Sequence, residues 1–286
     1  MVFDSGLTDE TSTWGLIQPV IAAHTRTCSY DRAGIGFSDP GIRAGSSANI
    51  VDDLHRLLAA ASIKPPYVLV GHSYGGMNIK LYADTYLSDV VGMVFVDPSH
   101  EDQTEGYRKL DLRQRSAAEW DKQLIEPSLI VRRECIAAAP AGFVPGTDLY
   151  KKCSFPPDPH YSAEINTVHS KIDLQQPFQQ AQLTEEENVF RASADQVRAA
   201  RRSFGDMPLI VLTSAPDRTP LPDVVKQNNR GARYRMWVGL HDDIAKLSTR
   251  GTNRIVPDSQ HNIMATQPDA VNSAILEVLK EANEKK

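Results

Sequence analysis

The chain has 286 residues, of which 41% are hydrophobic and 23% are charged, and its formal net charge is −5. This length and composition predict one globular domain with a sizeable core and room for an inserted subdomain. The mild acidity gives no electrostatic argument for binding to nucleic acid or to anionic membranes, and no apolar run is long enough to cross a bilayer.

The first part of the chain predicts short strands that alternate with helices. Residues 2–4 and 27–31 have the character of short buried strands, and residues 14–23 predict a helix that Pro19 begins or interrupts. A longer amphipathic helix is predicted over residues 46–62. Its apolar face consists of Ile50, Leu54, Leu57, Leu58 and Ala61.

Residues 30–40 read YDRAGIGFSDP and contain two closely spaced glycines. Gly34 and Gly36 superficially suggest the dinucleotide fingerprint G-x-G-x-x-G, but the third glycine of that pattern would fall at Asp39. The dinucleotide fingerprint is therefore not complete in this segment.

The segment YVLVGHSYGG, residues 67–76, organises the rest of the chain. Residues 67–70 form an apolar run that is typical of a strand buried on both faces. The G-x-S-x-G pattern then puts Ser73 on a turn so tight that Gly71 and Gly75 must have small side chains. A helix is predicted next, and its positive N-terminal end would lie beneath the serine.

A second doubly buried strand is predicted at residues 90–96, and the alternation of strand and helix indicates a doubly wound parallel sheet. Residues 98–207 break this rhythm with charged helical stretches, proline-rich turns and scattered aromatic residues. Within them, Thr184 and Glu187 form a T-x-x-E pattern that predicts the start of a helix.

The last part of the chain returns to the sheet pattern. Strands are predicted at residues 208–213 and 254–256, with a helix around 242–247 between them. Pro268 opens a terminal helix. His261 lies in the loop after the last strand, and ligands of open parallel sheets bind at this edge.

Three of these motifs resemble the α/β-hydrolase superfamily: the serine turn, the YDR-x-G-x-G loop and the segment QHNIMATQPDAV around His261. The resemblance implies an α/β fold, with a doubly wound, mostly parallel α/β-hydrolase sheet and a helical cap inserted after the strand that ends at Asp97. The core is expected at residues 1–97 and 208–286 and the cap at 98–207. The first two strands usual in the superfamily are absent from this sequence, which predicts a smaller sheet.

The resemblance also implies a catalytic site of the serine hydrolase type. Ser73 would be the nucleophile, and His261 would accept its proton. The loop after residues 2–4 would supply the backbone N–H of Leu7, and the N–H of Tyr74 would complete an oxyanion hole. This chemistry requires no metal and no organic cofactor.

Two carboxylates compete for the role of orienting the histidine. Asp217 follows the strand after which many members of the superfamily carry the acid, whereas Asp97 ends the preceding strand. The VDP context of Asp97 is similar to that of members that place the acid earlier, including lipases resembling pancreatic lipase, and it favours Asp97. Among the other histidines, we expect His72 to pack or bond locally and His241 to lie on a solvated helix face, and His100 has no assigned partner.

The three cysteines bear on the compartment of the protein. Cys28 is expected to be a small core residue, whereas Cys135 and Cys153, 18 residues apart, are compatible with one disulfide or with two free thiols. The first ten residues lack the basic and apolar regions of a signal peptide. A cytoplasmic location is therefore the default expectation, and a disulfide would favour an extracytoplasmic one. The sequence does not indicate the oligomeric state.

We expect a serine esterase that cleaves a small ester or a bulkier lactone through an acyl-enzyme intermediate, with no nucleic acid or membrane as partner. Amide or thioester cleavage and acyl transfer to another alcohol would use the same chemistry. Dehalogenases and epoxide hydrolases are disfavoured, because those relatives carry aspartate where Ser73 stands. The alternative is a ligand-binding protein or receptor on the same fold with slow or no turnover, and the smaller sheet gives this alternative some weight.

Overall fold

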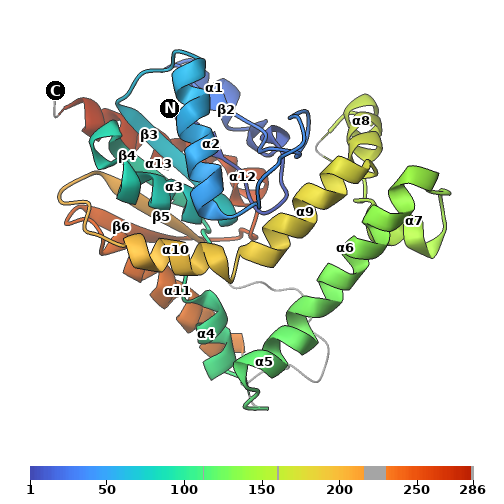
Figure 1. Ribbon diagram of the computed structural model, residues 1–286. Helices are drawn as coiled ribbons and strands as arrows, with labels where there is room; N and C mark the ends of the chain where they lie inside the picture. Colours follow the sequence, from blue (N-terminus) through green and yellow to red (C-terminus); the bar gives the residue numbers. More distant parts are fainter. Residues whose placement is uncertain (112, 160, 216–229, 285–286) are drawn as a thin grey trace.

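The computed structural model describes residues 1–111, 113–159, 161–215 and 230–284. Its centre is an open sheet of six parallel strands in the order β2-β1-β3-β4-β5-β6 (Figure 1). The strands are β1 (Val2–Asp4), β2 (Cys28–Ser29), β3 (Tyr67–His72), β4 (Val90–Val96), β5 (Leu209–Ser214) and β6 (Gly251–Val256). The predicted α/β class with a mostly parallel sheet is confirmed.

Helices cover both faces of this sheet (Figure 1). One face carries α1 (Gln18–Ala22), α12 (Ile263–Thr266) and α13 (Pro268–Asn283) with the 3₁₀ turn η1 (Thr11–Trp14). The other face carries α2 (Ser47–Ala60), α3 (Tyr74–Thr85), α10 (Ala192–Ala200) and α11 (Arg230–Ala245), and the 3₁₀ turn η2 (Leu87–Asp89) precedes β4. Pro19 occupies the first turn of α1, so it begins this helix rather than interrupting it.

The central strands β3 and β4 are buried on both faces, as their unbroken apolar runs predict. Along β3, Val68 and Val70 share a hydrophobic cluster with α13, whereas Leu69 shares the opposite cluster with α2 and α3. Successive side chains of a strand point to opposite faces, so a strand in the middle of a covered sheet needs apolar residues at every position.

Between β4 and β5 the chain forms a series of helices. These are α4 (Gln103–Lys109), α5 (Ala117–Trp120), the π-helical turn η3 (Asp121–Ile125), α6 (Glu126–Ala138), η4 (Ala139–Ala141), α7 (Asp148–Cys153), α8 (Ala163–Asp173), α9 (Gln176–Asn188) and α10. In Figure 1, α6, α7 and α8 project away from the sheet, whereas α10 lies against α2 and α3. The cap was expected in this region, and its division from the core at residues 98–207 stays a prediction.

Two local predictions are wrong. Thr184 does not start a helix but lies inside α9, where its hydroxyl accepts a hydrogen bond from the Gly45 N–H at 3.0 Å. The four-residue pattern misleads because it contains no information on the tertiary contact that occupies the hydroxyl. A capping box forms instead at Ser116 and Glu119. Cys28 is half-buried in the short strand β2 rather than enclosed in the core.

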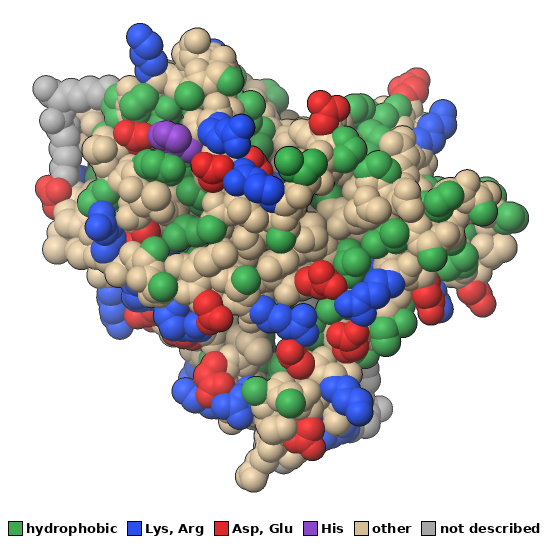
Figure 2. Space-filling model, in the orientation of Figure 1, with side chains coloured by type: hydrophobic (Ala, Val, Ile, Leu, Met, Phe, Trp, Pro, Cys, Tyr) green, Lys and Arg blue, Asp and Glu red, His purple; other side chains and the backbone are tan. Residues whose placement is uncertain are grey.

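Charged side chains of both signs are interspersed over the face of the molecule seen in Figure 2. Ion pairs of the described residues include Arg43 with Asp52 at 2.8 Å and Arg133 with Glu187 at 2.9 Å. Within the described ranges, no helix has the length and apolar character that a membrane span requires.

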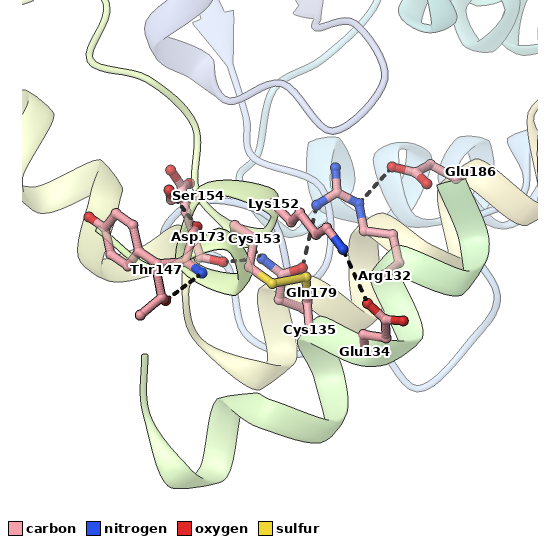
Figure 3. Close-up of a disulfide and its surroundings, with 11 residues drawn as sticks. Arg132, Glu134, Cys135, Thr147, Lys152, Cys153, Ser154, Asp173, Gln179 and Glu186 are labelled. Carbon is pink, nitrogen blue, oxygen red and sulfur yellow. Dashed lines mark hydrogen bonds and ion pairs between the residues drawn. A yellow bond between two sulfur atoms is a disulfide. The ribbon is translucent and has the colours of Figure 1, made fainter. Parts of the chain in front are cut away.

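Cys135 and Cys153 form a disulfide that ties α7 to α6, with their Cα atoms 5.5 Å apart (Figure 3). Both cysteines are buried, and the Gln179 side chain of α9 donates a hydrogen bond to the Cys153 carbonyl at 2.8 Å. Arg132 of α6 pairs with Glu186 of α9 at 2.8 Å. The disulfide and these polar contacts together join the three helices α6, α7 and α9.

Replacing both Cys135 and Cys153 with serine should lower the free energy of unfolding. The disulfide spans 18 residues of sequence, and a closed loop of that size corresponds to about 3 kcal/mol. Chemical denaturation of the wild type and the double variant measures the difference. The variant Cys28→Ser, which removes a free thiol, is the control and should unfold like the wild type. Equal stability of the double variant and the wild type would contradict the prediction.

Candidate active site

Ser73 stands at the corner between β3 and α3 in a strained backbone conformation. Its φ is 50° and its ψ is −118°, a region that residues with a side chain rarely adopt. The backbone is held there by hydrogen bonds from the Ser73 N–H to the Val96 carbonyl at 3.2 Å and from the Ser99 N–H to the Ser73 carbonyl at 2.8 Å. The side chain remains partly exposed. This is the geometry that the G-x-S-x-G pattern predicts for a serine turn.

The glycines of this turn leave room for backbone that passes very close to them. A Cβ atom on Gly71 would lie 2.5 Å from the Gly75 carbonyl oxygen, and one on Gly76 would lie 2.5 Å from the Pro98 side chain. A Cβ on Gly75 would collide with the Asp4 carbonyl of β1. These small residues therefore allow β1, β3 and the start of α3 to meet at one point.

Asp97 and His261 are in direct contact. The Nδ1 atom of His261 lies 2.7 Å from Oδ2 of Asp97. Asp97 follows the end of β4 and is 2% exposed, whereas the His261 side chain, in the loop after β6, is half-exposed. Because Nδ1 is engaged by the carboxylate, Nε2 is the ring nitrogen left for a second partner.

The surroundings of Asp97 favour its ionised form. Burial alone would raise the pKa of Asp97, but the hydrogen bond and the charge of His261 outweigh it and hold the pKa below its ordinary value. The N–H and the hydroxyl of Ser214, at the end of β5, donate to the two carboxylate oxygens at 2.9 and 3.0 Å. The other candidate acid, Asp217, lies outside the described residues.

Trp237 of α11 is a further contact of Asp97 that the sequence analysis did not identify. Its indole N–H donates to Oδ1 of Asp97 at 3.1 Å, and its ring stacks with that of Tyr107 on α4. The two bonded residues are 140 positions apart. No local pattern around a single tryptophan reports a contact over such a separation.

Ser73, Asp97 and His261 all follow the carboxyl ends of strands, which meet at one edge of a parallel sheet. In the part of the chain that the structure describes, the Ser73 hydroxyl has no hydrogen-bond partner, so it is not bonded to His261. In ligand-free enzyme structures, the hydrogen bond between a general base and the hydroxyl that it deprotonates is often long, and it shortens when substrate binds.

The loop between β1 and η1 runs beside the serine turn. Strands β1 and β3 pair with Asp4 opposite Gly71, which carries the following residues toward Ser73. The backbone N–H groups of Leu7 and Tyr74 have no acceptor among the described residues. Unpaired N–H groups are what an oxyanion hole requires, and that of Tyr74 belongs to the first turn of a helix.

Three other histidines, His72, His100 and His241, are buried and contact residues distant in the sequence. His72 was expected to pack or bond locally. It is buried, its Nε2 lies 3.2 Å from the carbonyl oxygen of His261, and the two rings are 4.7 Å apart. His100 is buried, with Nε2 3.1 Å from Asp243 and Nδ1 accepting from the Asp102 N–H at 3.0 Å. His72 therefore contacts the backbone of the loop that carries His261.

The prediction that His241 lies on a solvated face is wrong. The side chain is fully buried, with Nδ1 2.6 Å from the Thr213 hydroxyl and Nε2 3.0 Å from the Pro98 carbonyl. Burial lowers its pKa to about 4, so the ring is neutral at pH 7. The neighbouring acid Asp242 is partly buried and accepts a hydrogen bond from the Asn253 side chain of β6. Acidic neighbours in the sequence suggested a solvated face, but each has a partner in the fold.

Two further observations concern binding sites. Gly34 and Gly36 have φ values of 79° and 53°, as turn glycines do.

Among the described residues, no group of three or more His, Cys, Asp or Glu side chains could hold a metal ion. A cavity of about 600 Å³ lies between residues 38–45, α2 and α9, and neither Ser73 nor His261 lines it.

Comparisons with known proteins agree with this architecture. The model of the alpha/beta hydrolase family matches residues 1–274. Uncharacterized protein YqjL of Bacillus subtilis (strain 168) is 25% identical over 278 residues, which cover 97% of this chain and 82% of that protein. An uncharacterized protein of Schizosaccharomyces pombe is 45% identical over 82 residues, but these cover only 28% of this chain and 15% of that protein.

Solved structures are similar over nearly the whole chain. A thermophilic esterase from Thermogutta terrifontis superposes with a TM-score of 0.58 at 17% identity, covering 98% of this chain and 89% of the esterase. MenH from S. aureus gives a TM-score of 0.60 at 15% identity, covering 99% of this chain and 93% of MenH. At these identities the likeness concerns the fold alone.

Replacing Trp237 with phenylalanine should raise the pKa of Asp97, because the ionised carboxylate loses one of its donors. A hydrogen bond to a charged group contributes roughly 1.5–3 kcal/mol, so the ionised form of Asp97 should become less favourable when this donor is removed. An NMR titration that follows the side-chain carboxyl carbon of Asp97 measures the shift. The control is Trp120→Phe on α5, whose ring lies under Arg115 instead. Identical titrations of Trp237→Phe and wild type would contradict the prediction.

Proposed function

This chain belongs to the alpha/beta hydrolase family, and we propose that it is a serine hydrolase that cleaves a carboxylic ester or lactone through an acyl-enzyme intermediate. The observation that carries the proposal is the 2.7 Å bond between Asp97 and Nδ1 of His261 at the sheet edge that also bears Ser73. A buried carboxylate that orients a half-exposed imidazole has the chemistry of a general base for a nearby hydroxyl.

In the proposed reaction, Ser73 Oγ attacks the acyl carbon while Nε2 of His261 takes the hydroxyl proton. The tetrahedral intermediate collapses, and His261 returns the proton to the leaving alcohol. Water then attacks the acyl-enzyme, with His261 again accepting a proton. The bond between the acyl carbon and Ser73 Oγ breaks, His261 returns the proton to Ser73 Oγ, and the carboxylic acid leaves. Asp97 keeps the proton of the neutral imidazole on Nδ1 and stabilises the imidazolium when it forms.

The negative charge on the carbonyl oxygen of the tetrahedral intermediate would be bound by the backbone N–H groups of Leu7 and Tyr74. Each donor of this type is worth about 3 kcal/mol in related sites. The N-terminal end of α3 adds its partial positive charge at the same point. The unpaired state of both N–H groups among the described residues supports this role.

The choice of an ester rests on the nucleophile. A serine forms an acyl-enzyme that water hydrolyses, whereas dehalogenases and epoxide hydrolases of this superfamily use aspartate at the position of Ser73. The esterase from Thermogutta terrifontis shares the fold over 98% of this chain. Acyl transfer would follow the same steps with a second alcohol in place of water.

A fluorophosphonate probe should label the wild type and leave Ser73→Ala unlabelled. The same variant should lose at least about a thousandfold in turnover of short p-nitrophenyl esters, as removal of a serine nucleophile does. Ser170→Ala, on α8, removes a hydroxyl that donates to the Thr167 carbonyl, and it is the control. A well-folded wild type that neither takes the label nor cleaves esters would contradict the proposal and favour the ligand-binding alternative.

Asp97→Asn should reduce ester turnover by about ten-thousandfold, because the amide favours the wrong tautomer of His261. Asp217→Asn, the competing acid, should keep turnover within a few fold of wild type. Both are measured with p-nitrophenyl esters on proteins whose unfolding midpoints are compared first. Loss of turnover in Asp217→Asn with activity retained in Asp97→Asn would assign the acid to Asp217.

A further inference from the structure

We propose that Arg32 and Glu185 form a clamp through which helix α9 positions the loop of residues 5–8, and with it the Leu7 N–H of the oxyanion hole. Arg32 belongs to the YDR motif, for which the reaction steps give no role, and Glu185 lies in the inserted helices far along the chain. The clamp follows from contacts alone, and only its effect on turnover rests on the proposed function.

All five N–H donors of the Arg32 guanidinium are used. Nε and Nη2 donate to the two carboxylate oxygens of Glu185 at 2.6 and 3.0 Å. Nη1 donates to Oδ1 of Asp4 at 2.9 Å and to the Ser5 carbonyl at 2.8 Å, and Nη2 also donates to the Gly6 carbonyl. A planar guanidinium with every donor engaged has one orientation available.

Glu185 binds the loop directly as well. Its Oε2 accepts a hydrogen bond from the Thr8 N–H at 2.8 Å, in addition to that from Arg32. Thr8 has a φ of 60°, in the left-handed region, so the backbone here is held away from its preferred conformation. The loop is therefore fixed at the carbonyls of Ser5 and Gly6 and at the N–H of Thr8.

The direction of the Leu7 N–H follows from peptide geometry. The Gly6 carbonyl and the Leu7 N–H belong to the same planar trans peptide, so they point in opposite directions. Because Arg32 holds the Gly6 carbonyl, it also turns the Leu7 N–H away from the guanidinium. Of the N–H groups from Leu7 to Asp9, only that of Leu7 has no acceptor among the described residues.

The clamp is buried, so its charges depend on one another. The side chains of Arg32 and Glu185 are each 3% exposed, and that of Asp4 is fully buried. The Tyr30 hydroxyl donates to the second oxygen of Asp4 at 2.8 Å. Removal of one partner of a buried ion pair leaves the other charge uncompensated. A change at Glu185 should therefore be transmitted to the loop rather than absorbed by solvent.

The decisive variant is Glu185→Gln, which keeps the shape but replaces one oxygen by an NH₂ group that cannot accept a hydrogen bond. Either Arg32 or the Thr8 N–H then loses its acceptor. The matched control is Glu186→Gln on the same helix, because Glu186 pairs with Arg132 of α6 and not with the loop. Both variants remove one negative charge from α9, but of the two side chains it is Glu185 that contacts the loop of residues 5–8.

Hydrogen exchange of the backbone amides, followed by mass spectrometry, tests the clamp without reference to activity. We expect peptides covering residues 5–9 to exchange at least about tenfold faster in Glu185→Gln, and at the wild-type rate in Glu186→Gln. Exchange in Glu185→Gln equal to wild type, or the same acceleration in both variants, would overturn the clamp.

Kinetics with p-nitrophenyl esters tests the consequence for the site. Glu185→Gln should lower kcat about 10- to 100-fold with KM within twofold, because a misdirected oxyanion donor weakens binding of the transition state alone. Glu186→Gln should match wild type. Faster exchange with unchanged kcat would overturn the positioning role. A wild type without esterase activity or fluorophosphonate labelling would overturn the proposed function, and the exchange result would still decide the clamp.

A measurement on the wild type covers the case in which Glu185→Gln does not fold. The Thr8 amide should exchange at least about a hundredfold more slowly than the same amide in an unstructured peptide, since it donates to a buried carboxylate. The Leu7 amide, which has no acceptor among the described residues, should exchange faster than that of Thr8. An unprotected Thr8 amide would overturn the clamp.

Discussion

The strained corner at Ser73 constrains the arrangement of everything around it. A non-glycine residue holds a φ of 50° only when neighbouring structure supplies fixed partners, and here these are the backbones of Val96 and Ser99. Both partners belong to β4 or to the turn after it. The corner therefore requires that β3 and β4 be adjacent, and this adjacency brings Asp97, between those two partners, close to the serine turn.

Around that corner, polar groups are held by contacts between distant parts of the chain. Asp97 receives donors from β5, from α11 and from the loop after β6. Arg32 joins the loop after β1 to α9. In both cases a buried charge is surrounded by partners that satisfy it, because an unpaired charge in this environment would be strongly destabilising. Such fully paired groups resist displacement, which suits a site whose geometry must be kept.

Prediction from the sequence succeeded where a feature depends on neighbouring residues. The unbroken apolar runs of β3 and β4 predict strands buried on both faces, and the glycines around Ser73 predict a tight turn. Prediction failed where a polar side chain has a distant partner. The pattern around Thr184 predicted a helix cap, but its hydroxyl binds the Gly45 N–H. His241 was predicted to be solvated, but one of its ring nitrogens contacts the Pro98 carbonyl. Both contacts join residues far apart in the sequence, so neither produces a periodic pattern of residues that a sequence analysis could detect.

The sequence by itself determined the alternation of strands and helices, the sharp turn at Ser73 and the location of His261 after the last strand, because periodicity and steric limits act over a few residues. Three contacts were decided by the tertiary structure alone: the bond between Asp97 and His261, the bond from the Trp237 indole to Asp97, and the ion pair of Arg32 with Glu185. These contacts join residues that are 140 to 164 positions apart. Pairings over such distances are decided by how the sheet and its helices pack, which no local pattern encodes.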